Sequence, residues 1–147
     1  MAKKYYVLFS LFNFIFDCSL SFSDFLSSVR LSGGYAPYAG HVMVYHQGVW
    51  GTVCDNGWDE NDAAVVCREL GYPGVTMATK DSFYEYGPAG VINIELVGCY
   101  GNETKLSQCS YKTSAEQSVC RTKWGRNEAG VICEAGNNTD VKGNVLR

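Results

Sequence analysis

Cysteine constrains the fold of this chain more than any other residue type. The 147 residues include seven cysteines, a density typical of proteins from oxidising compartments. One of them, Cys18, lies apart near the N-terminus, and the rest are Cys54, Cys67, Cys99, Cys109, Cys120 and Cys133. Six cysteines allow fifteen pairings, so their spacing predicts a disulfide-stapled domain and leaves the connectivity open.

The segment that carries Cys18, residues 1–23, is predicted to be a signal peptide. Two lysines precede an uncharged, mostly apolar run at 7–16, which is half of the ~20 residues needed to cross a bilayer. Small residues of the kind that a signal peptidase accepts follow this run. The alternative is an uncleaved anchor. Cleavage would remove Cys18, leave an even number of cysteines and release a secreted chain with no membrane-spanning segment.

Charge and motifs argue against several functional classes. The formal net charge of −3 is not that of a nucleic-acid binder with a basic surface. The chain contains no metalloprotease, nucleophile or Cys-x-x-Cys motif. His41 and His46 lie five residues apart in a predicted strand, so they point to opposite faces. We interpret both as surface residues and predict that the protein is not an enzyme.

Local patterns predict a β-rich domain. Two β-branched and aromatic runs, 41–46 and 49–54, are joined by Gln47-Gly48 and predict a hairpin. Further strands are predicted at 29–31, 91–97 and 129–133, surface loops at 35–40 and 74–90, irregular chain at 110–128, and a disordered tail at 134–147.

One segment changes to a helical period. Apolar residues recur at the spacing of a single helix face at Ala63, Val66, Cys67 and Leu70. Asp59 is placed to cap the helix, and Asp62 adds negative charge to the first turn. Gly71 ends the helix in the usual left-handed position. Because Cys67 lies on the buried face, a disulfide there would staple the helix to the sheet.

These motifs resemble the scavenger receptor cysteine-rich (SRCR) domain. The most specific is Trp50-Gly51-Thr52-Val53-Cys54-Asp55, with twelve residues between Cys54 and Cys67. The other matching segments are Val29-Arg30-Leu31-x-Gly33-Gly34, Gly40-x-Val42-x-Val44, Leu70-Gly71-Tyr72, Leu106-x-x-Cys109 and Ala129-Gly130-Val131-x-Cys133. The resemblance covers residues 29–133.

The resemblance implies an α+β fold in which a curved antiparallel β-sheet cradles one α-helix. In the six-cysteine, group A pattern it also implies the bonds Cys54–Cys120, Cys67–Cys133 and Cys99–Cys109. The sequence departs from the family in residue type where Asn93 replaces a usual Trp, Leu96 replaces Asp or Asn, and Glu128 replaces Asp. It also departs in spacing, since twelve residues separate Cys120 from Cys133 and the Trp124-Gly125 pair follows Cys120 instead of preceding it.

The resemblance further implies a site for Ca²⁺ or Mg²⁺. Asp55 and Glu103 match two acidic ligands of the family, and Asn56 replaces the third. An Asn carbonyl still supplies the oxygen that hard cations prefer, but the lost charge predicts weak binding. The alternative is a solvated acidic loop. A second family site near Glu95 is not expected, because Leu96 cannot bind a metal.

Two further features concern ligands and glycans. Arg121, Lys123 and Arg126 form a basic cluster that is suited to polyanions, although an ordinary charged loop would have the same composition. Asn102 and Asn137 begin glycosylation sequons. A glycan on Asn102 would lie beside Glu103 and conflict with a metal site there.

The resemblance therefore implies a secreted, non-enzymatic binding module for polyanionic or microbial-surface ligands, or for an extracellular protein, with assistance from a cation. One alternative is a metal-independent protein–protein interaction domain that uses the Tyr-rich loop 81–90. The other is a fragment of a larger SRCR-containing receptor or protease.

Overall fold

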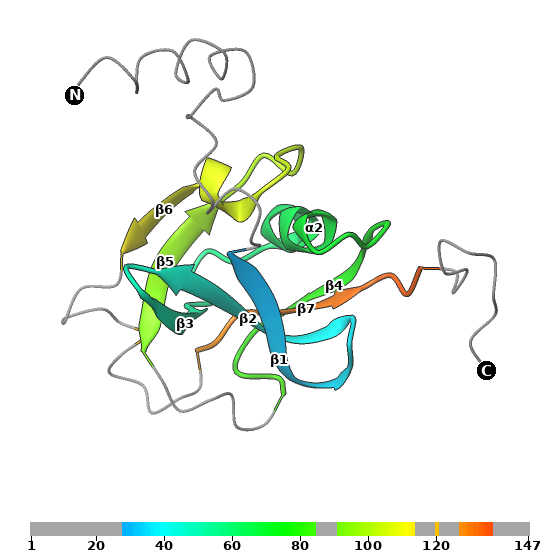
Figure 1. The fold of residues 1–147 in the computed structure, drawn as a ribbon, viewed down its shortest axis with the longest axis horizontal. Helices are drawn as coiled ribbons and strands as arrows, with labels where there is room; N and C mark the ends of the chain where they lie inside the picture. Colours follow the sequence, from blue (N-terminus) through cyan, green and yellow to red (C-terminus); the bar gives the residue numbers. More distant parts are fainter. Residues whose placement is uncertain (1–27, 85–90, 114–119, 121–126, 137–147) are drawn as a thin grey trace, which may run out of the picture.

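The computed structural model of the chain describes residues 28–84, 91–113, 120 and 127–136. In these ranges seven strands form one sheet that curls around a single α-helix (Figure 1). The elements are β1 (Val29–Ala36), β2 (Ala39–His46), β3 (Val49–Val53), α2 (Glu60–Glu69), β4 (Val75–Thr79), β5 (Ile92–Gly98), the 3-10 helix η2 (Leu106–Gln108), β6 (Ser110–Thr113) and β7 (Gly130–Cys133). The predicted α+β architecture is confirmed.

Strand β2 organises the sheet. The strand order is β4-β7-β2-β3-β5-β6, and β1 is a further strand, off this path, that also pairs with β2. The predicted hairpin is present, with Tyr45 opposite Trp50. Its turn residues, Gln47 and Gly48, have φ angles of 49° and 86°, the geometry that favours a two-residue hairpin turn. All pairings are antiparallel except β3 with β5, which is parallel.

Three stretches predicted as loop or irregular chain are strands. β1 continues through Gly33 and Gly34, so the predicted loop 35–40 shrinks to a turn at residues 37–38. β4 lies within the predicted surface loop 74–90, and β6 lies within the predicted irregular segment 110–128. These predictions were wrong because β4 and β6 are short, and β6 is exposed along its whole length. Such strands have little apolar alternation for a sequence pattern to detect.

The predicted helix and both of its ends are confirmed. The Asp59 side chain accepts hydrogen bonds from the amides of Asn61 and Asp62, and the Asp62 side chain accepts one from the Asp59 amide. This reciprocal arrangement is a capping box. Gly71 follows the helix with a φ of 84°, the left-handed conformation in which helices commonly end.

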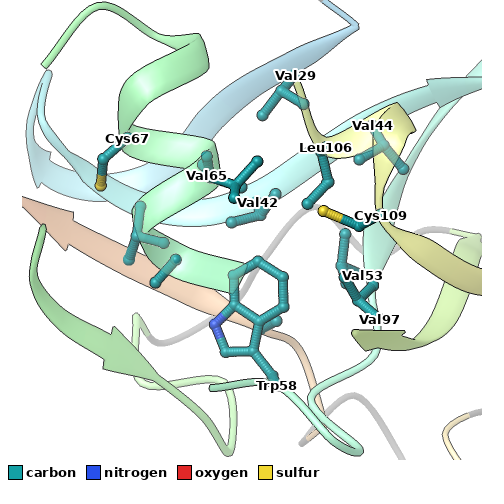
Figure 2. Packing of buried hydrophobic residues seen from close by; sticks show 14 of the residues in the cluster. Val29, Val42, Val44, Val53, Trp58, Val65, Cys67, Val97, Leu106 and Cys109 are labelled. Atoms are coloured by element: carbon teal, nitrogen blue, oxygen red, sulfur yellow. The ribbon is translucent and has the colours of Figure 1, made fainter. Parts of the chain in front are cut away.

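The core lies between α2 and the concave face of the sheet. Figure 2 shows Val65 of the helix directed toward Val42, with Val29, Leu106 and Val53 around them. Trp58 is fully buried below the helix and donates from Nε1 to the Gly130 carbonyl oxygen over 3.0 Å. Trp58, which directly precedes the N-cap of α2, therefore connects the start of the helix to β7.

Three disulfide bonds pair the cysteines as the resemblance implied. Cys54–Cys120 and Cys67–Cys133 each link residues 66 positions apart, and Cys99–Cys109 closes a ten-residue separation. The bond at Cys67 ties α2 to β7, as expected from its place on the buried helix face.

No helix within the described ranges is long and apolar enough to cross a membrane. The predicted signal peptide at 1–23, and the predicted tail beyond residue 136, lie outside the described residues.

Candidate functional site

The candidate site centres on the loop that the Cys99–Cys109 bond closes. Its carboxylate, Glu103, turns back on its own loop. Oε1 accepts the Tyr100 amide over 2.8 Å and Oε2 accepts the Gly101 amide over 2.9 Å. The Tyr100 amide chiefly, with help from Gly101, holds the pKa of Glu103 below its usual 4.5. Glu103 is therefore ionised and oriented at neutral pH.

Asp55 and Asn56 follow the first disulfide cysteine, at the end of β3. One oxygen of the half-buried Asp55 carboxylate, Oδ2, accepts the Asp81 amide over 2.7 Å. Asn56 is exposed, and its amide contacts the Cys54 sulfur over 3.4 Å. The backbone at both residues thus lies next to the first disulfide bond, where Cys54 is anchored to Cys120.

The donor atoms of this predicted set fit a hard cation in type. Two carboxylates and an amide carbonyl provide the oxygen ligands that Ca²⁺ and Mg²⁺ prefer, and each carboxylate oxygen that accepts one N–H keeps a second lone pair. In the part of the chain that the structure describes, the close groups of acidic, Cys and His ligand atoms are Cys54–Asp55–Cys120 and Cys99–Glu103–Cys109. Asp55 and Glu103 fall in different groups, and the sulfurs in both belong to disulfides rather than thiolates.

The other predicted site residues divide into described and undescribed positions. Asn102 is exposed beside Glu103, so its side chain is accessible for glycosylation. Arg121, Lys123, Arg126 and the second sequon residue, Asn137, lie outside the described residues. The same holds for residues 85–90 of the Tyr-rich loop.

Polar contacts that the sequence patterns missed hold the loop against α2. Asp62 is fully buried, and its Oδ1 accepts the Cys99 amide over 2.8 Å. Burial, more than any other cause, raises the pKa of Asp62 to about 6. Beyond Asp62, Arg68 donates to the Glu103 carbonyl oxygen and Glu69 accepts the Leu106 amide. The capping pattern located Asp62, but nothing in it pointed to a partner 37 residues away.

The position of His41 differs from the sequence-based expectation of a surface residue. It is fully buried rather than a surface residue, and its Nε2 lies 2.7 Å from the Tyr84 carbonyl oxygen and 3.8 Å from Glu128 Oε2. Because a carbonyl oxygen only accepts hydrogen bonds, Nε2 carries a proton. His41 is thus a core residue that links β2 to the chain beyond β4.

A small sheet wrapped on one helix and closed by long-range disulfides places the chain in the class of small disulfide-stapled domains, which is typical of oxidising compartments. Comparison with known proteins specifies the family. The family model of the scavenger receptor cysteine-rich domain matches residues 32–134.

Solved structures agree. The third SRCR domain of murine neurotrypsin is 38% identical, with a TM-score of 0.62 over 74% of this chain and 97% of that one. The SRCR domain of mouse MARCO, in its dimeric form, is 36% identical, with a TM-score of 0.53 over 65% of this chain and 85% of that one. The chain belongs to the SRCR family, whose domains are receptor-type extracellular binding modules and are generally non-enzymatic.

Proposed function

We propose that this chain is a secreted SRCR module of the six-cysteine group A, which binds anionic ligands with the assistance of a weakly held Ca²⁺ or Mg²⁺. The observation that carries this proposal is the Glu103 carboxylate, which is ionised and oriented by the Tyr100 and Gly101 amides. A carboxylate whose position is already fixed loses little freedom when a ligand binds to it.

In this proposal Asp55, Asn56 and Glu103 supply protein oxygens to the cation, and water or the ligand completes its coordination. Asn56 contributes no charge, so the expected dissociation constant is in the range of about 10⁻⁴–10⁻³ M that is typical of extracellular calcium modules. The cation would in turn attract sulfate, phosphate or carboxylate groups of the ligand. Arg121, Lys123 and Arg126 would contact the same groups, since guanidinium ions pair well with oxyanions.

Calorimetric titration of the purified protein with CaCl₂ tests the cation. The comparison variant is Glu103→Gln, and the matched control is Glu134→Gln, which neutralises an exposed carboxylate directly after β7, beside Gly74. Heat that saturates near the millimolar range, persists in the control and vanishes in Glu103→Gln supports the site. A protein that gives no heat contradicts it.

Heparin chromatography tests the basic cluster. A triple Gln variant at Arg121, Lys123 and Arg126 should elute at clearly lower salt than the unmodified protein, because each lost phosphate or sulfate contact weakens binding and its salt dependence. A triple Gln variant at Arg30, Lys80 and Lys112 removes the same charge from exposed positions. Equal elution of the two variants would contradict a specific role for the cluster.

A second candidate function, metal-independent recognition of a protein, is favoured by an aromatic patch. Phe83 and Tyr35 are 55% and 70% exposed, and both rings contact the buried ring of Tyr84 between them. Exposed aromatic residues are the usual anchors of protein interfaces. Ligand binding that survives EDTA but is lost in a Tyr35→Ala/Phe83→Ala variant would select this function over the first.

A further inference from the structure

The loop that carries Glu103 is attached to α2 at three points along the helix. The Cys99 amide donates to Asp62 Oδ1 over 2.8 Å at the start of the loop, and the Leu106 amide donates to Glu69 Oε2 over 2.8 Å near its end. Between them, Arg68 Nη1 donates to the Glu103 carbonyl oxygen over 2.6 Å. The two outer contacts hold the ends of the loop, and the Arg68 contact holds its middle.

The Arg68 contact differs from the other two because it acts on Glu103 itself. The Glu103 carbonyl accepts from Arg68 while the Glu103 carboxylate accepts from the Tyr100 and Gly101 amides. The backbone and the side chain of this one residue are therefore both held, the backbone by a side chain of α2 and the carboxylate by amides of its own loop. Ordering the long side chain of an exposed arginine costs entropy. The hydrogen bond from Arg68 to the Glu103 carbonyl oxygen offsets that cost.

The turn before Glu103 has little room to adopt another shape. Gly101 has a φ of 93°, a conformation that favours glycine. A Cβ atom at Gly101 would lie 2.8 Å from Asn61 Oδ1, so the turn lies close against the first turn of α2. With Asn61 on one side and Arg68 on the other, the helix surface defines where the 100–103 turn can sit.

We propose that Arg68 is a positioning residue of the ligand site, which holds the 100–103 turn so that the Glu103 carboxylate is oriented for a bound cation. The cation part of this inference rests on the proposed function; the positioning part does not. Arg68 touches neither the cation nor the ligand in this scheme. Its charge alone would weaken cation binding, because like charges repel.

Because of that repulsion, the two possible roles of Arg68 predict opposite changes in Ca²⁺ affinity. Replacing Arg68 with Met removes both the charge and the donor. If Arg68 acted only as a nearby positive charge, Arg68→Met would bind Ca²⁺ more tightly. As a positioning residue, its loss should raise the dissociation constant by about tenfold, the effect expected for losing one hydrogen bond from a charged donor. Arg68→Lys keeps a charge and a donor on a different stem, and should therefore bind Ca²⁺ more tightly than Arg68→Met does.

A readout without any cation separates this inference from the proposed function. Hydrogen exchange of the Tyr100 and Gly101 amides reports directly whether they remain bonded to Glu103. In Arg68→Met their exchange should quicken by about tenfold at constant pH, while amides in the middle of β2 exchange at unchanged rates. Arg30→Met is the matched control, since it removes another exposed arginine, one that stacks on Trp50 of β3.

The outcomes are distinct. Faster exchange of both amides together with weaker Ca²⁺ binding supports the whole inference. Faster exchange in a protein that binds no Ca²⁺ supports positioning and overturns the proposed cation function. Unchanged exchange, or Ca²⁺ binding that tightens in Arg68→Met, overturns the role assigned to Arg68.

Discussion

Loop length predicts how much each disulfide contributes to the stability of this domain. The Cys67–Cys133 bond spans 66 positions, and the Cys99–Cys109 bond spans ten. Cross-linking stabilises chiefly by restricting the unfolded chain, with an entropy that grows with the logarithm of the loop length. For these separations the relation gives about 4.4 kcal/mol for the long loop and about 2.7 kcal/mol for the short one.

The experiment replaces both cysteines of a pair with alanine and measures urea unfolding of the purified protein. The Cys67/Cys133 variant should lose about 1.7 kcal/mol more than the Cys99/Cys109 variant. Cys54–Cys120 provides an internal control, since it also spans 66 positions and its removal should match that of the other long bond. Domains are stable by only about 5–15 kcal/mol. Losing the whole long-loop contribution of about 4.4 kcal/mol should therefore leave these variants open to protease at body temperature.

Two results would refute this reasoning. One is a Cys67/Cys133 variant that resists thermolysin as well as the unmodified protein does. The other is equal loss of unfolding free energy in the long-loop and short-loop variants, which would mean that contacts around the cysteines, rather than loop entropy, determine the contribution of each bond.

Three further predictions follow from the backbone and the buried charge. Leu96 has a φ of 52° and is 39% exposed, so Leu96→Asn should raise the free energy of unfolding by about 1 kcal/mol and Leu96→Val should lower it, because Asn tolerates the left-handed region and β-branched residues do not. The urea midpoints of the two variants should lie on opposite sides of that of the parent. Gly51 lies against the Val91 carbonyl and the Asn93 side chain, so Gly51→Ala should cost about 2 kcal/mol in thermal or urea unfolding; an unchanged midpoint would show that β3 and β5 can separate freely. Because the pKa of Asp62 is raised to about 6 in the folded protein, the folded state keeps a proton there between about pH 4 and pH 6 that the unfolded chain loses. This stabilising contribution is present in full below about pH 4 and disappears as the pH rises through about 6. The difference in unfolding free energy between the parent and Asp62→Asn should therefore vary across this window, and a flat difference would contradict the burial argument.

The elements that sequence patterns predicted are those whose contacts are local. The hairpin depends on Gln47 and Gly48 between two apolar runs, and the helix depends on a capping box within four residues. Strand β6 was missed because its residues are all exposed and only its pairing with β5 makes it a strand. His41 was misplaced because the burial of a strand residue depends on what covers it, and here that is Tyr84, 43 positions away.

The candidate site divides in the same way. Glu103 could be located from the sequence by its resemblance to a family ligand, and its bonds to the Tyr100 and Gly101 amides lie within three residues. The contact between Arg68 and Glu103 could not, because 35 residues separate them. Leu96 lies between these two cases. The family resemblance pointed to Asp or Asn at this position, but only the structure, with a φ of 52° at Leu96, gives the physical reason for that preference.

The sequence by itself determined that this chain would build a disulfide-stapled, β-rich domain around one capped helix. Periodicity and turn residues are local patterns, and the cysteine count can be read directly from the composition. Only the tertiary structure decided which helix side chains hold the Glu103 loop and which histidine is buried. Hydrogen bonds between distant segments depend on how the sheet curls around α2, and that curl is a property of the assembled core rather than of any stretch of residues.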